Sequence, residues 1–268
     1  MSDTITVRGT STGEDIFSFT NADNEIVIAN IGDFGSADSN EQLVATLVES
    51  WEPDALTTTG VNSYNGPDYD ADVDPYYGDM VLRGMVYPCP GNHDWDDDLD
   101  AYFAYFEDTV GDRYYYKKTL GAVSLFMLDG NANTPDGILS SEVQSAWLTD
   151  ELSNSSSPWN VVMVHQPPYS SGTVHGSTAN LQWGFSGADL VLSGHEHNYE
   201  RLLVGGMQYI INGLGGKSKY AFGTPLSGSQ YRYNTLYGAG KMTVTPKRLQ
   251  WEFYSYDGAL VDSLEMEK

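Results

Sequence analysis

Residues 25–35 have the sequence EIVIANIGDFG, in which a short apolar run passes directly into a turn with two glycines and an aspartate. The apolar run predicts a buried strand over residues 25–31, and Asp33 follows its carboxyl end. In open α/β sheets, functional sites form in the loops at the carboxyl ends of strands. Asp33 is therefore the first candidate site residue of an expected α/β protein.

The alternation of strands and helices continues along the chain. Residues 40–51 carry apolar side chains at helical spacing, and Pro53 closes the helix that they predict. Further helices are expected at 99–106 and 139–152, strands at 55–58, 159–164, 188–192, 249–254 and 259–266, and a hairpin at 113–120 and 121–128. This order fits two packed sheets flanked by helices.

The domain organisation is expected to be simple. Residues 1–24 are polar and predict an N-terminal arm or an edge hairpin, whereas residues 25–268 predict a single domain without an internal repeat or linker. The first residues have no basic start followed by an apolar stretch, so they predict no secretory signal. No apolar run approaches the ~18 residues that a membrane span needs.

The charge balance excludes several classes of partner. The chain has 13 Lys and Arg against 37 Asp and Glu, a net charge of −24. Nucleic acids and anionic membranes are themselves polyanions, so neither is an expected partner. The single cysteine, Cys89, excludes an intrachain disulfide framework and a Cys-rich metal site, and is expected to be a small buried residue.

An acidic segment at residues 67–79 raises the alternative of a calcium loop. Asp68, Asp70, Asp72 and Asp74 alternate as calcium ligands do. The sixth position of the pattern is not Gly and the twelfth is not Glu, which argues against it. We expect an irregular loop there.

Three smaller expectations concern packing. The helix at 139–152 is expected to be capped by Ser140 or Ser141 and to turn Val143, Trp147 and Leu152 inward. Neighbouring Glu200 and Arg201 are expected to form a structural ion pair, and the segment at 167–169 to shape a loop.

All five histidines lie at predicted strand ends or in loops rich in Gly and Pro: His93, His165, His175, His195 and His197. A lone histidine is commonly a structural hydrogen-bonding group, but five such placements indicate a shared site. If the GHEH segment (194–197) is extended, both of its imidazoles point the same way and can serve one metal ion or two neighbouring ions. Together with oxygens from Asp33 and Asn92, imidazoles suit Zn, Mn or Fe. Such ions would attract the phosphate that the net charge otherwise repels.

Five short motifs carry a family resemblance: GDFG (32–35), GVNSY (60–64), GNHD (91–94), VMVH (162–165) and GHEH (194–197). Each is weak alone, but in this order at strand ends they resemble the calcineurin-like metallophosphoesterase superfamily. Gly35 and Tyr64 make the chain more similar to purple acid phosphatases, including the tartrate-resistant type. The resemblance spans roughly residues 25–266. It implies a four-layer α/β/β/α sandwich of two mixed sheets flanked by helices.

The resemblance also implies a set of ligands and catalytic groups. One transition-metal ion (Fe, Zn or Mn) would be held by Asp33, Tyr64 and His197, and a second by Asn92, His165 and His195. His93 would orient the phosphate and protonate the leaving oxygen, and His175 would line the pocket. Asp94 is expected to orient His93 through a hydrogen bond. The substrate would be a small phosphorylated molecule, and no feature identifies a protein partner.

One position departs from the family pattern. Val61 stands where the resemblance implies an aspartate that bridges the two metal ions, and valine has no lone pair to offer. The neighbouring Asn62 would face the other way from an extended segment. The bridging carboxylate is therefore absent, and the expected result is weakened activity or mixed metal occupancy.

Two main functions remain open at this point. The favoured one is metal-dependent hydrolysis of phosphate esters, chiefly monoesters, by a metal-bound hydroxide. The alternative is a catalytically impaired phosphatase-like protein that serves in binding or structure. The 19 tyrosines suggest a third alternative, a carbohydrate- or surface-binding module. The resemblance favours an extracellular or periplasmic location.

Overall fold

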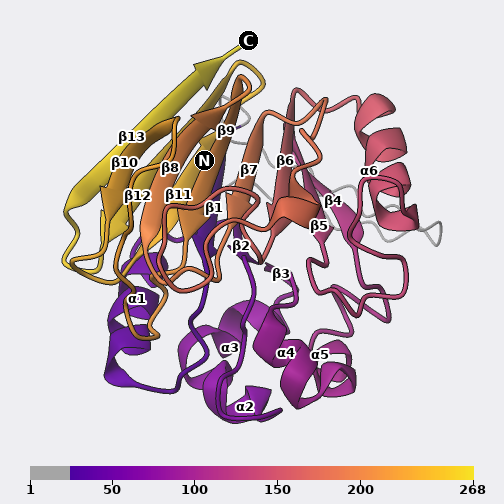
Figure 1. The fold of residues 1–268 in the computed structure, drawn as a ribbon. Helices are drawn as coiled ribbons and strands as arrows, with labels where there is room; N and C mark the ends of the chain where they lie inside the picture. The colour runs from indigo at the N-terminus through magenta and orange to yellow at the C-terminus, as the bar shows by residue number, and fades with distance from the viewer. Residues whose placement is uncertain (1–24) are drawn as a thin grey trace, which may run out of the picture.

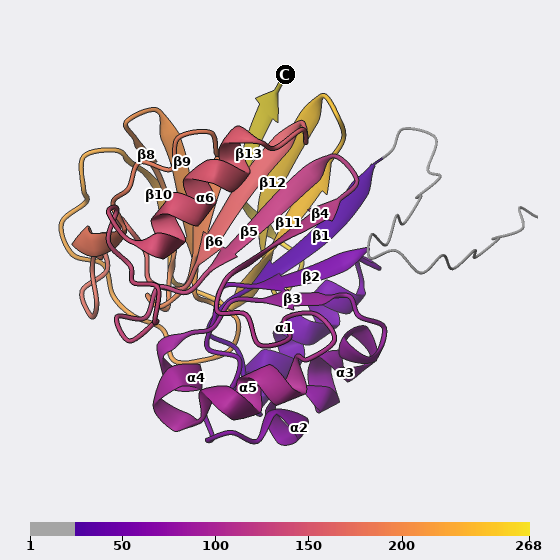
Figure 2. The same ribbon diagram turned by 90° about the vertical axis from the view of Figure 1, so that its right-hand side faces the viewer.

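The computed structural model describes residues 25–268, and the expected arm at 1–24 lies outside the described residues. Two sheets pack face to face, and helices flank them on both sides (Figure 1 and Figure 2). This confirms the α/β fold of two mixed sheets that the sequence predicts. Among the helices of residues 25–268, none has the length and apolar character that crossing a membrane requires.

The first sheet has six strands in the order β13-β12-β11-β1-β2-β3. Its strands are β1 (Ile26–Ile31), β2 (Ala55–Thr58), β3 (Val86–Pro88), β11 (Gly238–Val244), β12 (Arg248–Ser255) and β13 (Leu260–Glu267). β1, β2 and β3 run parallel, whereas β11 pairs antiparallel with β1. The carboxyl ends of the three parallel strands therefore meet at one edge.

The second sheet has seven strands in the order β10-β8-β9-β7-β6-β5-β4. Its strands are β4 (Tyr116–Leu120), β5 (Val123–Leu128), β6 (Trp159–Val164), β7 (Leu190–Ser193), β8 (Tyr199–Val204), β9 (Met207–Asn212) and β10 (Ser229–Tyr233). β4 and β5 form the predicted antiparallel hairpin. β5, β6, β7 and β9 are parallel neighbours at the centre of the sheet.

The helices cover the outer faces and one end of the sandwich. They are α1 (Ser39–Glu49), α2 (Tyr69–Asp72), α3 (Asp74–Leu82), α4 (Asn92–Asp97), α5 (Leu99–Tyr105) and α6 (Val143–Ser153), with a short 3-10 helix at Ala179–Leu181. Figure 1 shows α6 beside the second sheet and α1 to α5 gathered around the ends of β1, β2 and β3.

Two hydrophobic clusters hold the layers together. The larger lies between the sheets and under α1, and it includes Val44 of α1, Met163 of β6 and Trp251 of β12. The smaller joins Leu148 of α6 to Val162 on the outer face of the second sheet. Burial of this apolar surface is the main force that holds the sandwich closed.

Local sequence explains why α1 begins where it does. The Asp38 side chain accepts hydrogen bonds from the backbone N–H groups of Asn40 and Glu41, which caps the first turn. Val44, Leu47 and Val48 then repeat at helical spacing and are buried.

Two expectations about helices are wrong. The acidic segment at 67–79 is not an irregular loop: it forms α2 and most of α3, and Tyr69 and Tyr77 are buried within it. α6 begins at Val143 after Glu142, which makes no side-chain cap, and not at the predicted serines. Of the three residues expected to face inward, Leu152 is buried and Trp147 packs against the core, whereas Val143 is 58% exposed.

Candidate metal centre

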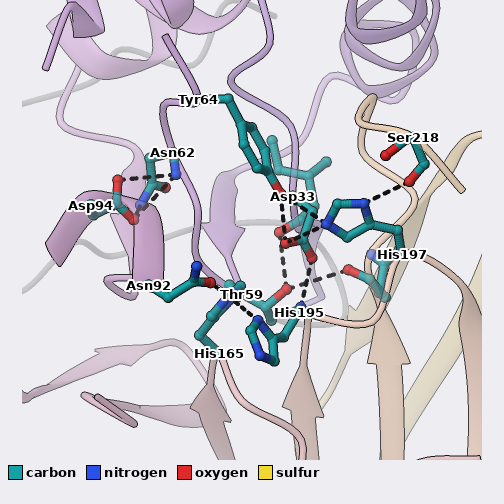
Figure 3. A network of polar contacts seen from close by, with 12 residues as sticks. Asp33, Thr59, Asn62, Tyr64, Asn92, Asp94, His165, His195, His197 and Ser218 are labelled. Atoms are coloured by element: carbon teal, nitrogen blue, oxygen red, sulfur yellow. Dashed lines mark hydrogen bonds and ion pairs between the residues drawn. The ribbon is translucent and has the colours of Figure 1, made fainter. Parts of the chain in front are cut away.

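Six of the predicted site residues come together at the carboxyl ends of parallel strands from both sheets. Asp33 follows β1, and the segments after β2 and β3 supply one oxygen-bearing side chain each, Tyr64 and Asn92. His165 follows β6, and two further histidines follow β7. Figure 3 shows these side chains pointing toward one another: Asp33, Tyr64, Asn92, His165, His195 and His197.

The first triplet consists of Asp33, Tyr64 and His197. The Tyr64 hydroxyl donates to Asp33 Oδ1 at 3.0 Å and lies 3.0 Å from His197 Nε2. His197 Nε2 is itself 3.4 Å from Asp33 Oδ1. Two oxygens and one ring nitrogen therefore surround a single point.

The second triplet consists of Asn92, His165 and His195. His165 Nε2 lies 3.0 Å from Asn92 Oδ1 and 3.1 Å from His195 Nδ1. Asp33 connects the two triplets, because its second oxygen accepts the backbone N–H of His195 at 2.7 Å.

Two of the imidazoles are oriented by backbone carbonyls. His165 Nδ1 donates to the Thr59 carbonyl at 2.7 Å, and His197 Nδ1 donates to the Ser218 carbonyl at 2.6 Å. Each ring therefore keeps Nε2 for its own triplet. This is the usual arrangement of histidines that bind metal, in which the second nitrogen donates to a carbonyl or carboxylate.

The electrostatics of the centre favour a bound cation. Burial raises the pKa of Asp33, but His197 and His165 outweigh it and hold the pKa at about 2. Burial lowers the pKa of His197, but the Asp33 carboxylate outweighs it, so the pKa is raised. The first triplet thus favours positive charge: without a metal ion, the Asp33 carboxylate stabilises the protonated form of His197.

The histidines of the second triplet are neutral. Burial, followed by the neighbouring His165, lowers the pKa of His195 to about 2. Burial also lowers the pKa of His165, even though Asp33 acts in the opposite direction. Neutral imidazole is the form that coordinates a metal ion.

The donor set fits transition-metal ions. Among residues 25–268, no three His, Cys, Asp or Glu side chains surround one point, so each triplet depends on its Tyr or Asn member. Imidazole, carboxylate, phenol and amide donors together suit Zn, Fe or Mn better than Ca or Mg. The two triplets could hold one ion each.

The GHEH segment is not extended at His195, so the condition under which its two imidazoles would point the same way is not met. Its φ of 68° lies in the left-handed region and turns the chain between the two histidines. The ring of His195 therefore joins the second triplet and that of His197 joins the first. Of the two alternatives, one ion or two neighbouring ions, the geometry fits the second.

Close backbone packing supports the second triplet. A Cβ on Gly60 would lie 2.6 Å from His165 Nδ1, so only glycine lets the imidazole approach the backbone. Gly60 also has a φ of 89°, which other residues rarely adopt. The glycine of the GVNSY motif is therefore part of the centre.

Val61 contributes no ligand, and Asn62 does not replace it. Val61 is buried and has a φ of 46°, an uncommon conformation for a β-branched residue that Asn and Asp adopt more easily. The Asn62 side chain is turned to Asp94 and to the Cys89 carbonyl. The backbone at position 61 thus has a conformation that suits an aspartate.

The predicted hydrogen bond between His93 and the Asp94 carboxylate is not formed. Asp94 is buried, and its carboxylate accepts from the Gly91 N–H at 2.7 Å, the Tyr69 hydroxyl at 2.8 Å and Asn62. Burial raises its pKa to about 6 despite these donors. Asp94 holds the GVNSY and GNHD loops together, which is a structural role.

The two other predicted catalytic histidines lie beside the triplets. The His93 ring packs against Tyr64 with centroids 4.7 Å apart. The His175 ring stacks on His195 with centroids 3.8 Å apart and planes at 25°. Both side chains are therefore within reach of a group bound at the centre.

The expected ion pair between Glu200 and Arg201 is also wrong. Arg201 pairs with Asp262 at 2.7 Å, and Glu200 accepts from Ser171. Adjacent residues in a strand point to opposite faces, so the two side chains of β8 could not meet.

Two residues near the centre were not predicted. Tyr220 stacks on His197 with centroids 4.0 Å apart and planes at 9°. Lys217 Nζ lies 4.4 Å from the centroid of the Tyr64 ring. Both come from the loop after β9, whose sequence carries no recognisable motif. Only their position in the fold reveals them.

Comparisons with known proteins agree with this architecture. The family model for calcineurin-like phosphoesterase matches residues 26–199. Purple acid phosphatase 5 of Arabidopsis thaliana is 27% identical over 199 residues, which are 68% of this chain and 46% of that protein. Purple acid phosphatase 1 of Ipomoea batatas is 27% identical over 205 residues, covering 65% and 42%. The chain thus spans less than half the length of these curated relatives.

Solved structures share the fold at low sequence identity. The purple acid phosphatase PPD1 from yellow lupin seeds has a TM-score of 0.73 and 16% identity, over 91% of this chain and 54% of that chain. GAP50, described as the anchor in the inner membrane complex of Plasmodium, has a TM-score of 0.71 and 18% identity, over 91% and 89%. At these identities the likeness shows the fold alone.

Proposed function

The chain belongs to the calcineurin-like phosphoesterase family, and from this premise we propose that it hydrolyses small phosphate esters, chiefly monoesters, at the two triplets. The observation that carries the proposal is the orientation of the imidazoles. His165 and His197 each donate Nδ1–H to a backbone carbonyl and present Nε2 to oxygen ligands from the opposite sheet.

Each triplet would hold one Fe, Zn or Mn ion. Bound metal would supply positive charge for the phosphoryl oxygens and lower the pKa of water toward about 7. Asp33 contributes a carboxylate to the first triplet and fixes the His195 backbone beside the second. Without a cation, burial and Asp33 raise the pKa of Tyr64 well above its usual value, so the phenol itself stays neutral.

His93 is the proposed proton donor to the leaving oxygen. It follows Asn92 directly, and its half-buried ring packs on Tyr64 of the first triplet. An imidazole at this place can reach a substrate at the centre and still exchange protons with water. His175 would line the other side, because its ring covers His195 of the second triplet.

The proposed substrate is a small anion. Lys217 adds a positive charge next to Tyr64, which would help to attract a phosphate group toward an otherwise acidic protein. The net charge of −24 opposes the approach of larger polyanions such as nucleic acid.

A second candidate function is supported by Val61. The residue offers no ligand between the triplets, so a phosphatase-like protein of low or lost turnover could serve in binding or structure. The similar fold of the Plasmodium anchor is compatible with this candidate. It predicts a folded protein that retains little metal and hydrolyses no ester.

One experiment separates the two candidates. The purified protein is supplemented with Fe, Zn or Mn, freed of excess metal, and measured both by elemental mass spectrometry and with a generic aryl phosphate. The phosphoesterase proposal expects bound metal together with hydrolysis. If the protein binds no metal and hydrolyses no aryl phosphate after any of the supplements, the second candidate, a binding or structural protein, is favoured.

A further inference from the structure

A buried carboxylate lies between the two histidines of the GHEH segment. Glu196 has no exposed surface, and its carboxylate lies against the loop of residues 170–177. Its Oε1 accepts the backbone N–H of His175 at 2.5 Å and that of Gly176 at 2.6 Å. One glutamate oxygen therefore holds the part of the loop that carries His175.

A second buried carboxylate holds the other end of the same loop. Glu200 accepts the N–H of Ser171 at 2.7 Å and its hydroxyl at 2.6 Å. Within residues 25–268, neither Glu196 nor Glu200 takes part in an ion pair. The N–H and hydroxyl groups of the loop thus supply the hydrogen bonds that two buried acidic side chains need.

The loop lies directly on the Glu196 carboxylate. A Cβ on Gly172 would lie 2.1 Å from the carboxyl carbon of Glu196, so a larger residue would have to displace either the loop or the carboxylate and would break their contact. The Glu196 Oε2 atom, which faces this glycine, has no hydrogen-bond partner within the described part of the chain. Because residue 172 is glycine, the loop backbone can pack directly against the Glu196 carboxylate.

The loop in turn covers one face of a proposed metal ligand. The His175 imidazole stacks on His195, the residue that precedes Glu196 in sequence. His195 Nδ1 faces His165, so the stack leaves that nitrogen free for the second triplet. Glu196 thus holds the loop by hydrogen bonds, and His175 of that loop stacks on His195, the sequence neighbour of Glu196.

We propose that Glu196 is a positioning residue, which fixes the loop of residues 170–177 and thereby holds His175 against His195 where a substrate would bind. Its effect on turnover rests on the proposed phosphoesterase function. Its effect on the loop does not, and the two can be measured separately.

The test compares Glu196→Ala with Glu196→Gln in the full chain. Hydrogen exchange measures the loop directly, and metal content and aryl phosphate kinetics are followed on the same samples. In Glu196→Ala, the amides of His175 and Gly176 lose their acceptor and should exchange at least about 10-fold faster. KM should rise about 10-fold while kcat changes less than about 3-fold, because substrate positioning is lost and the triplets remain. Metal content should stay at the wild-type level.

Glu196→Gln is the matched control. Its amide oxygen can still accept both N–H groups, so slow exchange and a wild-type KM should return. The pair also separates charge from positioning, because Gln keeps the acceptor and removes the negative charge. If Gln restores slow exchange but leaves KM at the Ala level, KM does not depend on the placement of the loop and the positioning role is wrong.

A double variant tests whether the effect runs through His175. His175→Ala alone should raise KM without faster exchange at Gly176. Glu196→Ala combined with His175→Ala should be no worse in KM than the more severe of the two single variants, since both remove the same contact. Additive losses would overturn the proposed route.

Two further outcomes keep the test decisive. If Glu196→Ala does not fold, Gly172→Ala is used in its place, because its Cβ would push the loop off the carboxylate and should give the same exchange and KM pattern. Unchanged exchange in the loop of either folded variant overturns the proposal. If the wild type hydrolyses no aryl phosphate, the proposed function fails, and the exchange data alone still decide the role of Glu196.

Discussion

His165 Nε2 and His195 Nδ1 lie 3.1 Å apart, although both imidazoles are neutral and come from different strand ends. Asn92 Oδ1 is 3.0 Å from the same His165 nitrogen. Three electron-pair donors thus converge on a small region, and all three of these side chains are neutral. A cation that sits among them would be held by neutral ligands only.

The first prediction concerns this convergence and its neighbour. Replacing His195 and His197 together with Ala should abolish stoichiometric binding of Zn, Fe or Mn, because each triplet loses one ligand. Elemental mass spectrometry after metal supplementation measures the result. Wild-type protein free of all three metals under these conditions would contradict the assignment of both triplets.

The second prediction concerns His93. As a proton donor it should matter most for poor leaving groups, so His93→Ala should lower kcat on an alkyl phosphate by about 10²–10⁴-fold. The effect on an aryl phosphate with an acidic phenol should be much smaller, since that leaving group needs no proton. Metal content, expected at the wild-type level, is the control. Equal losses on both substrates would remove His93 from proton transfer.

The third prediction concerns Val61. Val61→Asp should raise both metal content and hydrolysis, because a carboxylate between two cations reduces their repulsion and the backbone φ of 46° suits Asp better than Val. Val61→Asn is the matched control, since it adopts the same backbone conformation without the charge. Metal titration with parallel assays compares the three proteins. A wild type that already binds two ions tightly, with Asp changing nothing, would show that another group serves as the bridge.

The fourth prediction concerns pH and stability. Burial of Glu41, opposed by the N–H groups of Ser36 and Ala37, raises its pKa from 4.5 to about 8. The folded state therefore binds this proton more tightly than the unfolded state does. The contribution of Glu41 to stability is complete below about pH 4.5 and is lost as the pH rises toward 8.

Glu41→Gln removes this titration. Between pH 5 and pH 8, the unfolding free energy of the wild type should fall relative to that of Glu41→Gln by on the order of 3 kcal/mol. Urea unfolding at both pH values measures the difference, and the comparison with Glu41→Gln cancels the effects of the other titrating groups. A constant difference between the two proteins would mean that Glu41 does not titrate in this range.

Local patterns in the sequence predicted much of the fold. The apolar runs of β1, β2 and β6 are buried strands because each is short, continuous and bounded by turn residues. The helix of α1 was visible from its spacing and from the proline after it. In the acidic segment, by contrast, no periodic pattern of apolar residues predicts α2 and α3. Tyr69 and Tyr77 are buried there through contacts with distant parts of the chain.

The site was predicted where single motifs suffice and missed where distant residues meet. The six triplet residues lie together because strand order brings their loops to one edge. Asp94, however, bonds to Asn62, which lies 32 residues away, and no local signal indicates that pairing. The positive φ of His195 could not be predicted from the sequence either, because a histidine in that conformation is unusual.

Each triplet combines side chains that follow strands of both sheets: Asp33 and Tyr64 join His197, and Asn92 joins His165 and His195. Metal would therefore fasten one half of the sandwich to the other. Metal bound only by the folded chain, at a free concentration 100 times its Kd, adds about 2.7 kcal/mol to stability. The metal supply would then influence the amount of folded protein in a cell. Metal starvation would lower this amount in the same way as a substitution that destabilises the hydrophobic core.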